Sequence, residues 1–249
     1  DTARMDAFRR AIDASVRPGD VVLDLGCGSG VLSFMACEAG AGKVYAIEGG
    51  PVIDVAQELA VDNGFDDRIE FLGGWSMEVG IPERADVLIS ETIGNAGFDE
   101  GIVAWTVDAR RRLLRPDAVL LPQRLRLWVA AAESFDDHAV VSDWQAPSLP
   151  YDCSAAYRRA ARTLWYSDLT SNNLLGQAEL AADVDLRCAT DQTIRSSGTL
   201  VVERDGVLHG MACWFDSLLS PGVTVDNMPE HSESSWSHGF LPLAEPLAV

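Results

Sequence analysis

Apolar and polar positions follow two different periods along the first part of the chain. Residues 21–25 (VVLDL) form a nearly continuous apolar run, which is typical of a strand buried on both faces. A glycine turn follows, and residues 31–39 then carry apolar side chains at helical spacing before a second apolar run at residues 44–47. This order predicts one strand–turn–helix–strand unit with parallel strands and a right-handed crossover.

The same alternation continues on both sides of this unit. Residues 1–16 and 51–63 have apolar side chains three or four positions apart, as amphipathic helices do. Short apolar runs at residues 69–72 and 85–90 predict two further strands. Strands that alternate with helices in this way predict a doubly wound, Rossmann-like α/β domain over residues 1–121.

Beyond residue 121 the pattern changes to successive strands. Strand-like segments follow at residues 124–131, 182–189, 198–203 and 207–215. Residues 204–206 (RDG) predict a hairpin turn between the last two of them. We therefore expect a second, mostly β domain over residues 122–249, with a helical insertion at about 151–167. The spacing alone allows this insertion to be either a projecting arm or a core helix.

Composition narrows the class of protein. The 249 residues are 47% hydrophobic and 23% charged, as in ordinary globular proteins. The formal net charge of −19 disfavours nucleic acid and anionic membranes as partners and favours cationic ones, although acidity that serves only solubility is an even alternative. Five cysteines without a C-x-x-C pair argue against a disulfide framework and a zinc site, so we expect a cytoplasmic protein that holds no metal. No apolar run is long enough to predict a transmembrane helix.

The glycine turn at residues 26–30 (GCGSG) is a candidate nucleoside site. Glycines permit positive φ and let a ligand approach the main chain closely. Glu48 ends the second strand 20 positions after Gly28, where a carboxylate can accept hydrogen bonds from both ribose hydroxyls. Val31 stands where a dinucleotide fingerprint has its third glycine, which argues against NAD.

A pair of acids follows the last strand predicted for the first domain. Glu91 comes directly after residues 85–90, at the edge where open α/β sheets bind their ligands. Glu100 is nine positions later, and the two glycines between them let the loop fold back and bring both carboxylates together. Two close carboxylates favour a cation between them, and a planar guanidinium matches both. The alternative is that both are ordinary exposed loop acids, which are common.

Taken together, these motifs resemble a known family. The sequence DLGCGSG (residues 24–30) is similar to motif I of class I S-adenosylmethionine (SAM) methyltransferases. With SETIGN (residues 90–95) and the second acid, the chain is similar to the protein arginine methyltransferase family, in which paired glutamates, the double-E loop, hold a guanidinium. Residues 1–4 (DTAR) match the D-x-x-R motif of that family, residues 208–216 (LHGMACWFD) match a strand of its β-barrel, and residues 234–236 (SSW) match its threonine–histidine–tryptophan loop.

The resemblance implies a role for each matched position. The positions implied to bind SAM are Arg4 for its carboxylate, Asp24, Gly26 and Gly28 for its amino acid end, Glu48 for its ribose, and Ser76 and Met77 for its adenine. The positions implied for the substrate are Glu91 and Glu100 around the guanidinium, and Thr92, Asn95 and Trp236 along the pocket. No metal is implied, because the sulfonium of SAM is already an activated methyl donor.

Some positions depart from the family pattern. Ser235 replaces the histidine that pairs with the aspartate of D-x-x-R, so we expect Asp1 to lose its partner. Met77 replaces an acid, which leaves adenine selection to backbone contacts. Thr92 and Asn95 replace a tryptophan and a tyrosine, and these smaller side chains indicate a differently shaped substrate.

The sequence therefore predicts SAM-dependent N-methyl transfer to the guanidino nitrogen of arginine. Free L-arginine or another small guanidine is favoured by the altered pocket, and protein or peptide arginine is the alternative that the family implies. A non-catalytic SAM-binding regulatory module is a further alternative, against which the two retained glutamates argue. The family has a dimerisation arm where the helical insertion lies, so the resemblance implies a β-barrel-like second domain with an arm and a homodimer.

Overall fold

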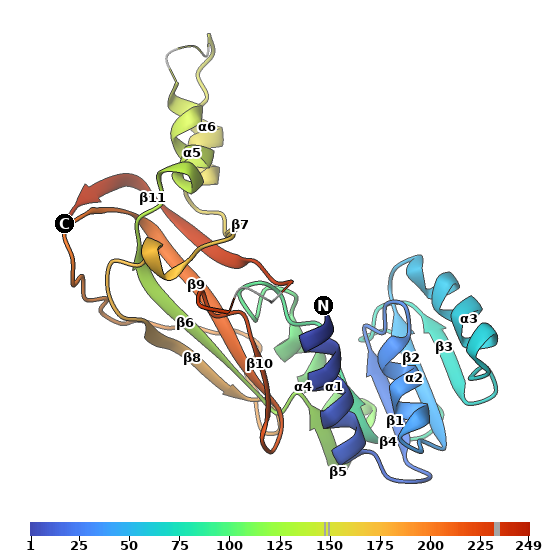
Figure 1. Cartoon of the computed structure of the whole chain (residues 1–249). Helices are drawn as coiled ribbons and strands as arrows, with labels where there is room; N and C mark the ends of the chain where they lie inside the picture. The colour runs from blue at the N-terminus through green and yellow to red at the C-terminus, as the bar shows by residue number, and fades with distance from the viewer. Residues whose placement is uncertain (147, 149, 232–234) are drawn as a thin grey trace.

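The structure is a computed structural model that describes residues 1–146, 148, 150–231 and 235–249. Figure 1 shows a parallel sheet with its helices, an antiparallel sheet beside it, and a helical projection from the second sheet. The parallel sheet has the order β3-β2-β1-β4-β5. Its strands are β1 (Val21–Leu25), β2 (Lys43–Glu48), β3 (Ile69–Gly73), β4 (Ala85–Ile89) and β5 (Leu114–Leu121). Its helices are α1 (Thr2–Ser15), α2 (Val31–Glu38), α3 (Val52–Asn63) and α4 (Ile102–Arg112).

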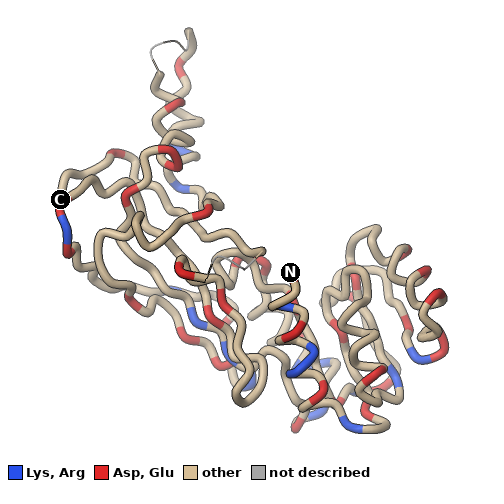
Figure 2. The backbone as a smooth tube through the Cα atoms, in the orientation of Figure 1, with Lys and Arg blue, Asp and Glu red and all other residues tan. Residues whose placement is uncertain are grey.

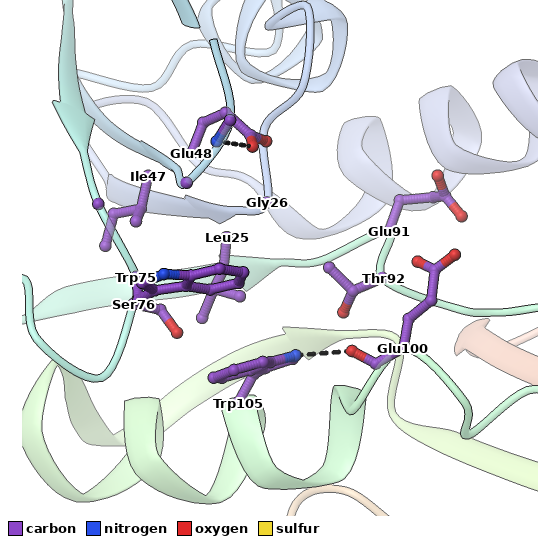
Figure 3. A pocket seen from close by; sticks show the side chains of 13 residues that line it. Leu25, Gly26, Ile47, Glu48, Trp75, Ser76, Glu91, Thr92, Glu100 and Trp105 are labelled. Carbon is purple, nitrogen blue, oxygen red and sulfur yellow. Dashed lines mark hydrogen bonds between the residues drawn. The ribbon is translucent and has the colours of Figure 1, made fainter. Parts of the chain in front are cut away.

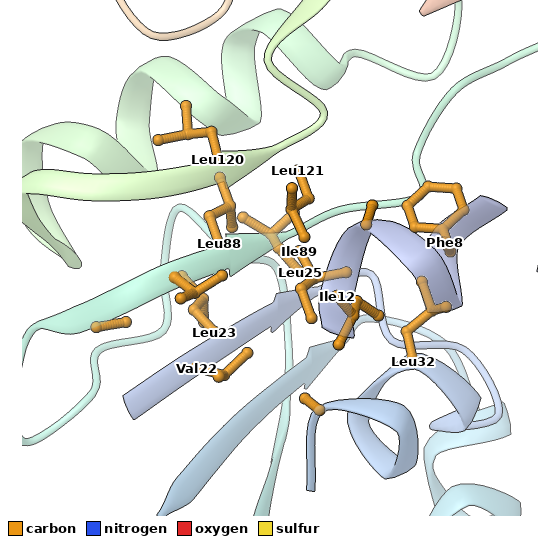
Figure 4. Packing of buried hydrophobic residues seen from close by; sticks show 14 of the residues in the cluster. Phe8, Ile12, Val22, Leu23, Leu25, Leu32, Leu88, Ile89, Leu120 and Leu121 are labelled. Atoms are coloured by element: carbon orange, nitrogen blue, oxygen red, sulfur yellow. The ribbon is translucent and has the colours of Figure 1, made fainter. Parts of the chain in front are cut away.

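The apolar runs of the sequence form the middle of this sheet. Every residue of β1 is buried, including the single polar one, which confirms that this strand is covered on both faces. Phe8 and Ile12 of α1 are fully buried and pack over the sheet with Leu23, Ile89 and Leu121 (Figure 4). The α/β fold predicted from the alternating pattern is confirmed.

The antiparallel sheet has the order β7-β11-β9-β6-β8, and β10 pairs with β9. Its strands are β6 (Arg124–Ala132), β7 (Trp165–Ser167), β8 (Glu179–Asp185), β9 (Val207–Ser220), β10 (Val223–Asp226) and β11 (His238–Ala248). Strand β9 is the central strand, since it pairs with β6, β10 and β11. Its Phe215 and Leu219 are fully buried in the same apolar cluster as the parallel sheet, so one core joins the two sheets.

The prediction of a strand at residues 198–203 and a hairpin at 204–206 is wrong. No regular strand forms there, although the segment contains three apolar residues in a row. Its end is instead held by single contacts, because Glu203 N donates to Leu175 O (2.8 Å) and the Arg204 guanidinium binds Glu133 and the carbonyls of Leu174 and Asn172. One backbone hydrogen bond and the side-chain contacts of Arg204 thus replace the strand pairing that the composition of this segment favoured.

The helical insertion is a projecting arm rather than a core helix (Figure 1). It consists of α5 (Phe135–Ser142), which the sequence did not reveal, the 3₁₀ turn η1 (Asp143–Gln145), and α6 (Ser154–Ala160). Helix α6 is shorter than predicted because Asp152 accepts a hydrogen bond from Ser154 N (3.0 Å) at its start and the Trp165 indole donates to Ala160 O (3.0 Å) at its end. Residues 165–167, expected to continue the arm, form the edge strand β7.

The acidic residues are spread over the whole fold. Figure 2 shows Asp and Glu on the helices of the parallel sheet, along the antiparallel sheet and on the arm. The net charge of −19 is therefore not gathered into a single patch. Within the described ranges, no helix is both long enough and apolar enough to cross a lipid bilayer.

Candidate active site

The glycine loop after β1 is closed by a carboxylate from β2. Gly26 and Gly28 have positive φ (76° and 53°), which lets the loop turn tightly. Gly26 N donates to Ile47 O (2.9 Å), so the loop is tied to the end of the neighbouring strand. Glu48 accepts hydrogen bonds from Gly28 N (3.0 Å) through one oxygen and from Gly50 N (2.7 Å) through the other. The carboxylate thus lies in a fixed position at the carboxyl edge of the sheet.

A cavity of about 510 Å³ opens at this edge. It joins the glycine loop to the loop between β4 and α4, which carries the paired acids (Figure 3). The sequence-predicted residues that line it are Gly26, Glu48, Ser76, Glu91, Thr92 and Glu100. The structure therefore brings the nucleoside-binding candidates and the guanidinium-binding candidates into one space.

Other predicted residues lie outside this cavity. Met77 is 41% exposed and does not line it. Asn95 does not line the cavity either, but its backbone helps to hold the loop, since its carbonyl accepts a hydrogen bond from Asn227 Nδ2 (2.8 Å). Arg4 and Trp236 line an adjacent cavity of about 460 Å³.

Arg4 connects this adjacent cavity to the paired acids. Its Nη1 is 3.6 Å from Glu91 Oε2, and its guanidinium carbon lies 4.7 Å from the centroid of the Trp236 ring. Its Nε is buried and has no hydrogen-bond partner among the described residues. An anionic group that reached this guanidinium would satisfy a donor that the protein leaves unpaired.

The carboxyl of Asp24 is fully buried beneath the glycine loop. Ser33 Oγ donates to its Oδ2 (2.6 Å), while Oδ1 has no partner among the described residues. Burial raises the pKa of Asp24 to about 6, and the hydrogen bonds from Ser33 oppose this rise. The charge that Asp24 carries above this pH would be stabilised by a cation at the glycine loop.

The paired acids are poised to receive a cation. Burial raises the pKa of Glu91 to about 7; the positive charge of Arg4 opposes the rise, and the negative charges of Glu100 and Asp24 add to it. Burial and the charge of the neighbouring Asp99 raise the pKa of Glu100. A guanidinium between the two acids would favour the ionised form of both.

Both sheets hold the loop that carries these acids. On the parallel sheet, Ser90 Oγ donates to Leu25 O (3.1 Å). From the antiparallel sheet, Phe215 packs so closely against Gly97 that a Cβ at that position would lie 2.8 Å from the Phe215 side chain. The Trp236 indole also donates to Ile93 O (3.0 Å). The guanidinium side of the cavity therefore depends on both halves of the chain.

The expectation that Asp1 loses its partner is wrong. Both the backbone N and the Oγ of Ser235 donate to Asp1 Oδ2, at 3.0 and 2.9 Å. A serine can replace the family histidine here because its hydroxyl and its amide reach the same carboxylate oxygen. Ser234, which belongs to the matched triplet, lies outside the described residues.

Two tryptophans that no sequence motif singled out also line the cavity. Trp75 and Trp105 have nearly parallel rings, 17° apart, with centroids separated by 6.2 Å (Figure 3). The Trp105 indole also donates to Glu100 O (2.8 Å). Trp75 follows the strand predicted at residues 69–72 and the two glycines after it, and this place at the ligand-binding edge of the sheet is a sequence signal that could have marked it. Within the described part of the chain there is no cluster of three or more side chains suited to bind a metal.

Known proteins resemble this chain in sequence. Residues 8–96 match the family model of ribosomal protein L11 methyltransferase (PrmA). The chain is 29% identical over 258 residues to the arginine N(omega)-methyltransferase of Streptomyces achromogenes subsp. streptozoticus, covering 100% of this chain and 70% of that protein. It is 33% identical over 287 residues to protein arginine N-methyltransferase PRMT10 of Oryza sativa subsp. japonica, covering 100% of this chain and 75% of that protein.

Solved structures share the fold. Protein arginine methyltransferase 10 of Arabidopsis thaliana superposes with a TM-score of 0.80 at 25% identity, covering 100% of this chain and 82% of the other. The Trypanosoma brucei PRMT1 enzyme–prozyme heterotetrameric complex with AdoHcy gives a TM-score of 0.84 at 24% identity, covering 100% and 81%. With the sequence match to the rice enzyme over three quarters of its length, these findings establish that the chain belongs to the protein arginine N-methyltransferase family of SAM-dependent enzymes.

Proposed function

We propose that the enzyme methylates the guanidino group of free L-arginine or of another small guanidine. The observation that carries this proposal is the cavity in which Glu91 and Glu100 lie across from the glycine loop and Glu48. Thr92 leaves more room beside the acids than the tryptophan that the family resemblance implies. The name of the Streptomyces relative, arginine N(omega)-methyltransferase, supports arginine as the substrate.

The residues around the glycine loop fit SAM. Glu48 would accept hydrogen bonds from the ribose, Asp24 would stabilise the positive amino acid end, and the unpaired Nε of Arg4 would contribute to binding its carboxylate. Bound SAM supplies a methyl group that a nitrogen can take directly from the sulfonium.

The paired acids would do the rest of the chemistry. Glu91 and Glu100 accept hydrogen bonds from the guanidinium and fix its plane, so that one nitrogen points toward the cofactor half of the cavity. Their charges also stabilise the positive charge that moves onto the substrate during transfer. The substrate must lose one proton, and Glu91, as an ionised carboxylate beside the guanidinium, is suited to accept it.

Protein or peptide arginine is the second candidate. The cavity that contains Arg4 continues along α1 and β10, where Asp226 and Glu230 would attract a basic peptide. Of the two relatives described above, the rice enzyme is named for protein arginine.

The deciding experiment offers SAM with free L-arginine in one reaction and with an arginine-rich peptide in another, followed by mass spectrometry. Methylated free arginine alone supports the proposal, and methylated peptide alone overturns it in favour of the second candidate. The Glu100→Gln variant is the matched control, since any product that it forms equally well does not come from this site. If neither reaction gives product while SAM binds, the chain is a SAM-binding module without this activity.

Trp75 and Trp105 are proposed to form the aromatic wall on which the adenine of SAM stacks. Their nearly parallel rings line the cavity, and Met77, the position implied for adenine, does not. Stacking on an aromatic side chain contributes about 1–3 kcal/mol per base. Trp75→Ala is therefore expected to raise the Kd of SAM by about 10-fold or more in titration calorimetry. Trp75→Phe, which keeps an aromatic face, should remain close to wild type, and equal Kd values for all three proteins would contradict this placement.

The arm is proposed to form a homodimer. It projects away from both sheets, and it carries the exposed aromatic residues Phe135, Trp144 and Tyr151. Light scattering should give the mass of a dimer, twice 26.9 kDa, for the wild type. The double variant Trp144→Glu/Tyr151→Glu should give the mass of a monomer, 26.9 kDa. Val201→Glu, at an exposed apolar position outside the arm, is the control and should leave the mass unchanged. A wild type that stays monomeric at high concentration would overturn this proposal.

A further inference from the structure

Strand β7 brings one side chain to the loop that carries Glu100. The Tyr166 hydroxyl donates to Asp99 Oδ2 at 2.8 Å, and Asp99 directly precedes Glu100. These two residues are 67 positions apart, and Tyr166 follows the helical arm in the chain. The contact therefore joins the base of the arm to the loop of the paired acids.

Asp99 braces this loop from inside. Its Oδ1 accepts a hydrogen bond from Ala96 N (2.9 Å). Its carboxylate lies so close to Gly94 that a Cβ there would be 2.3–2.5 Å from the carboxylate atoms. Gly97 N donates to Gly94 O (2.8 Å) and closes the same turn. The Asp99 side chain thus has one oxygen bound to the loop and the other bound to Tyr166.

The position of Tyr166 is itself fixed. It pairs with Gly239 in the register of β7 with β11. The absence of a side chain at Gly239 leaves room for the loop and the end of the arm to meet, because a Cβ there would lie 2.9 Å from Leu164 Cδ1 and 3.2 Å from Ala96 Cβ. The hydroxyl therefore approaches Asp99 from a strand whose register is set by its pairing with β11.

We propose that Tyr166 is a positioning residue for methyl transfer, which holds Asp99 and thereby the segment that carries Glu100. Within the described ranges, no residue makes a hydrogen bond to the Glu100 carboxylate, so its place depends on its backbone anchors. One anchor is the Trp105 indole, which donates to Glu100 O (2.8 Å), and the other is the Tyr166–Asp99 contact on the preceding residue. The proposal rests on arginine methylation at Glu91 and Glu100, for either class of substrate.

The first test compares Tyr166→Phe with wild type. Loss of a hydrogen bond to a charged acceptor should lower kcat about 10-fold, while the KM for the guanidine changes less and the Kd of SAM and the melting temperature stay the same. Tyr157→Phe is the matched control. Its hydroxyl, in helix α6 of the arm, donates to Ala244 O at 2.8 Å, away from the loop of the paired acids. A kcat for Tyr166→Phe within two-fold of Tyr157→Phe would overturn the proposal.

Substitutions of Asp99 test the same pair from the other side. Asp99→Asn keeps groups that can pair with Tyr166 and Ala96 and should retain most of the kcat, while Asp99→Ala should lose at least as much as Tyr166→Phe. The double variant Tyr166→Phe/Asp99→Ala should be no slower than Asp99→Ala alone, because each change already removes the hydrogen bond between Tyr166 and Asp99. Fully additive losses would contradict the proposal.

Hydrogen exchange separates this proposal from the proposed function. Backbone amides of residues 94–101 should exchange faster in Tyr166→Phe than in wild type or Tyr157→Phe, whether or not methylation is observed. Unchanged exchange overturns the positioning role. An inactive wild type with faster exchange in Tyr166→Phe overturns the proposed function and leaves the structural contact established.

Discussion

Replacing Glu91 or Glu100 by glutamine is expected to lower the kcat of arginine methylation by about 100-fold or more. Glutamine keeps the shape of the side chain but not its charge, so the guanidinium loses the acceptor that fixes its plane and stabilises the developing charge. The Glu100 carboxylate is not among the groups proposed to bind SAM and, unlike Glu91, it is not the ion-pair partner of Arg4, so the Kd of SAM should change little in Glu100→Gln. Initial rates at saturating SAM, together with calorimetric titration of SAM, measure both quantities.

A control variant distinguishes this effect from a general effect of charge. Glu58→Gln, on the exposed side of α3, removes the same charge far from the cavity and should leave kcat unchanged. Near-full activity of Glu91→Gln with unaltered SAM binding would show that the paired acids do not hold the substrate.

The activity should fall steeply as the pH drops below 7. Burial raises the pKa of Glu91 to about 7, so the neutral acid predominates below that pH and cannot hold a guanidinium as a charged acceptor. At subsaturating substrate, the slope of kcat/KM should approach 10-fold for each pH unit well below this value, which amounts to a fall of about 50-fold between pH 7 and pH 5. A pH series of kcat/KM for the guanidine substrate in buffers of constant ionic strength measures this limb.

The pH dependence of kcat at saturating substrate checks the role of Glu91. Bound guanidinium stabilises the ionised acid, so the acid limb of kcat at saturating substrate should lie at lower pH than the limb of kcat/KM. A kcat/KM profile that stays flat down to pH 5 would contradict the role of Glu91, since an ordinary exposed glutamate titrates near 4.5.

The parallel sheet and the location of the candidate site follow from local signals in the sequence. The apolar run of β1, the glycines behind it and Glu48 at the end of β2 are close in sequence, and parallel strands bring their carboxyl ends to one edge. Glu91 reaches the same cavity for the same reason, because β4 lies beside β1. The roles of these residues remain predictions.

The contacts that the sequence did not reveal join distant parts of the chain. Asp1 and Ser235 are 234 positions apart, and the serine in place of the family histidine predicted a lost contact, whereas the amide and the hydroxyl of Ser235 both bind Asp1. Trp75 follows β3 and Trp105 lies in α4, so no local pattern of the sequence shows that the two rings meet. The segment at residues 198–203 has the composition of a strand but is held by contacts of Arg204, which no periodicity reveals.

The shared support of the paired-acid loop bears on how enzymes of this kind can diverge. The nucleoside side of the cavity is built by the parallel sheet, whereas Phe215 of β9 and, between β10 and β11, Asn227 and Trp236 hold the other side. Changes in these three side chains can therefore alter which guanidine is accepted without altering the residues at the glycine loop. Gene lineages that inherit this arrangement can acquire new substrates through the second half of the chain while the first half conserves its cofactor.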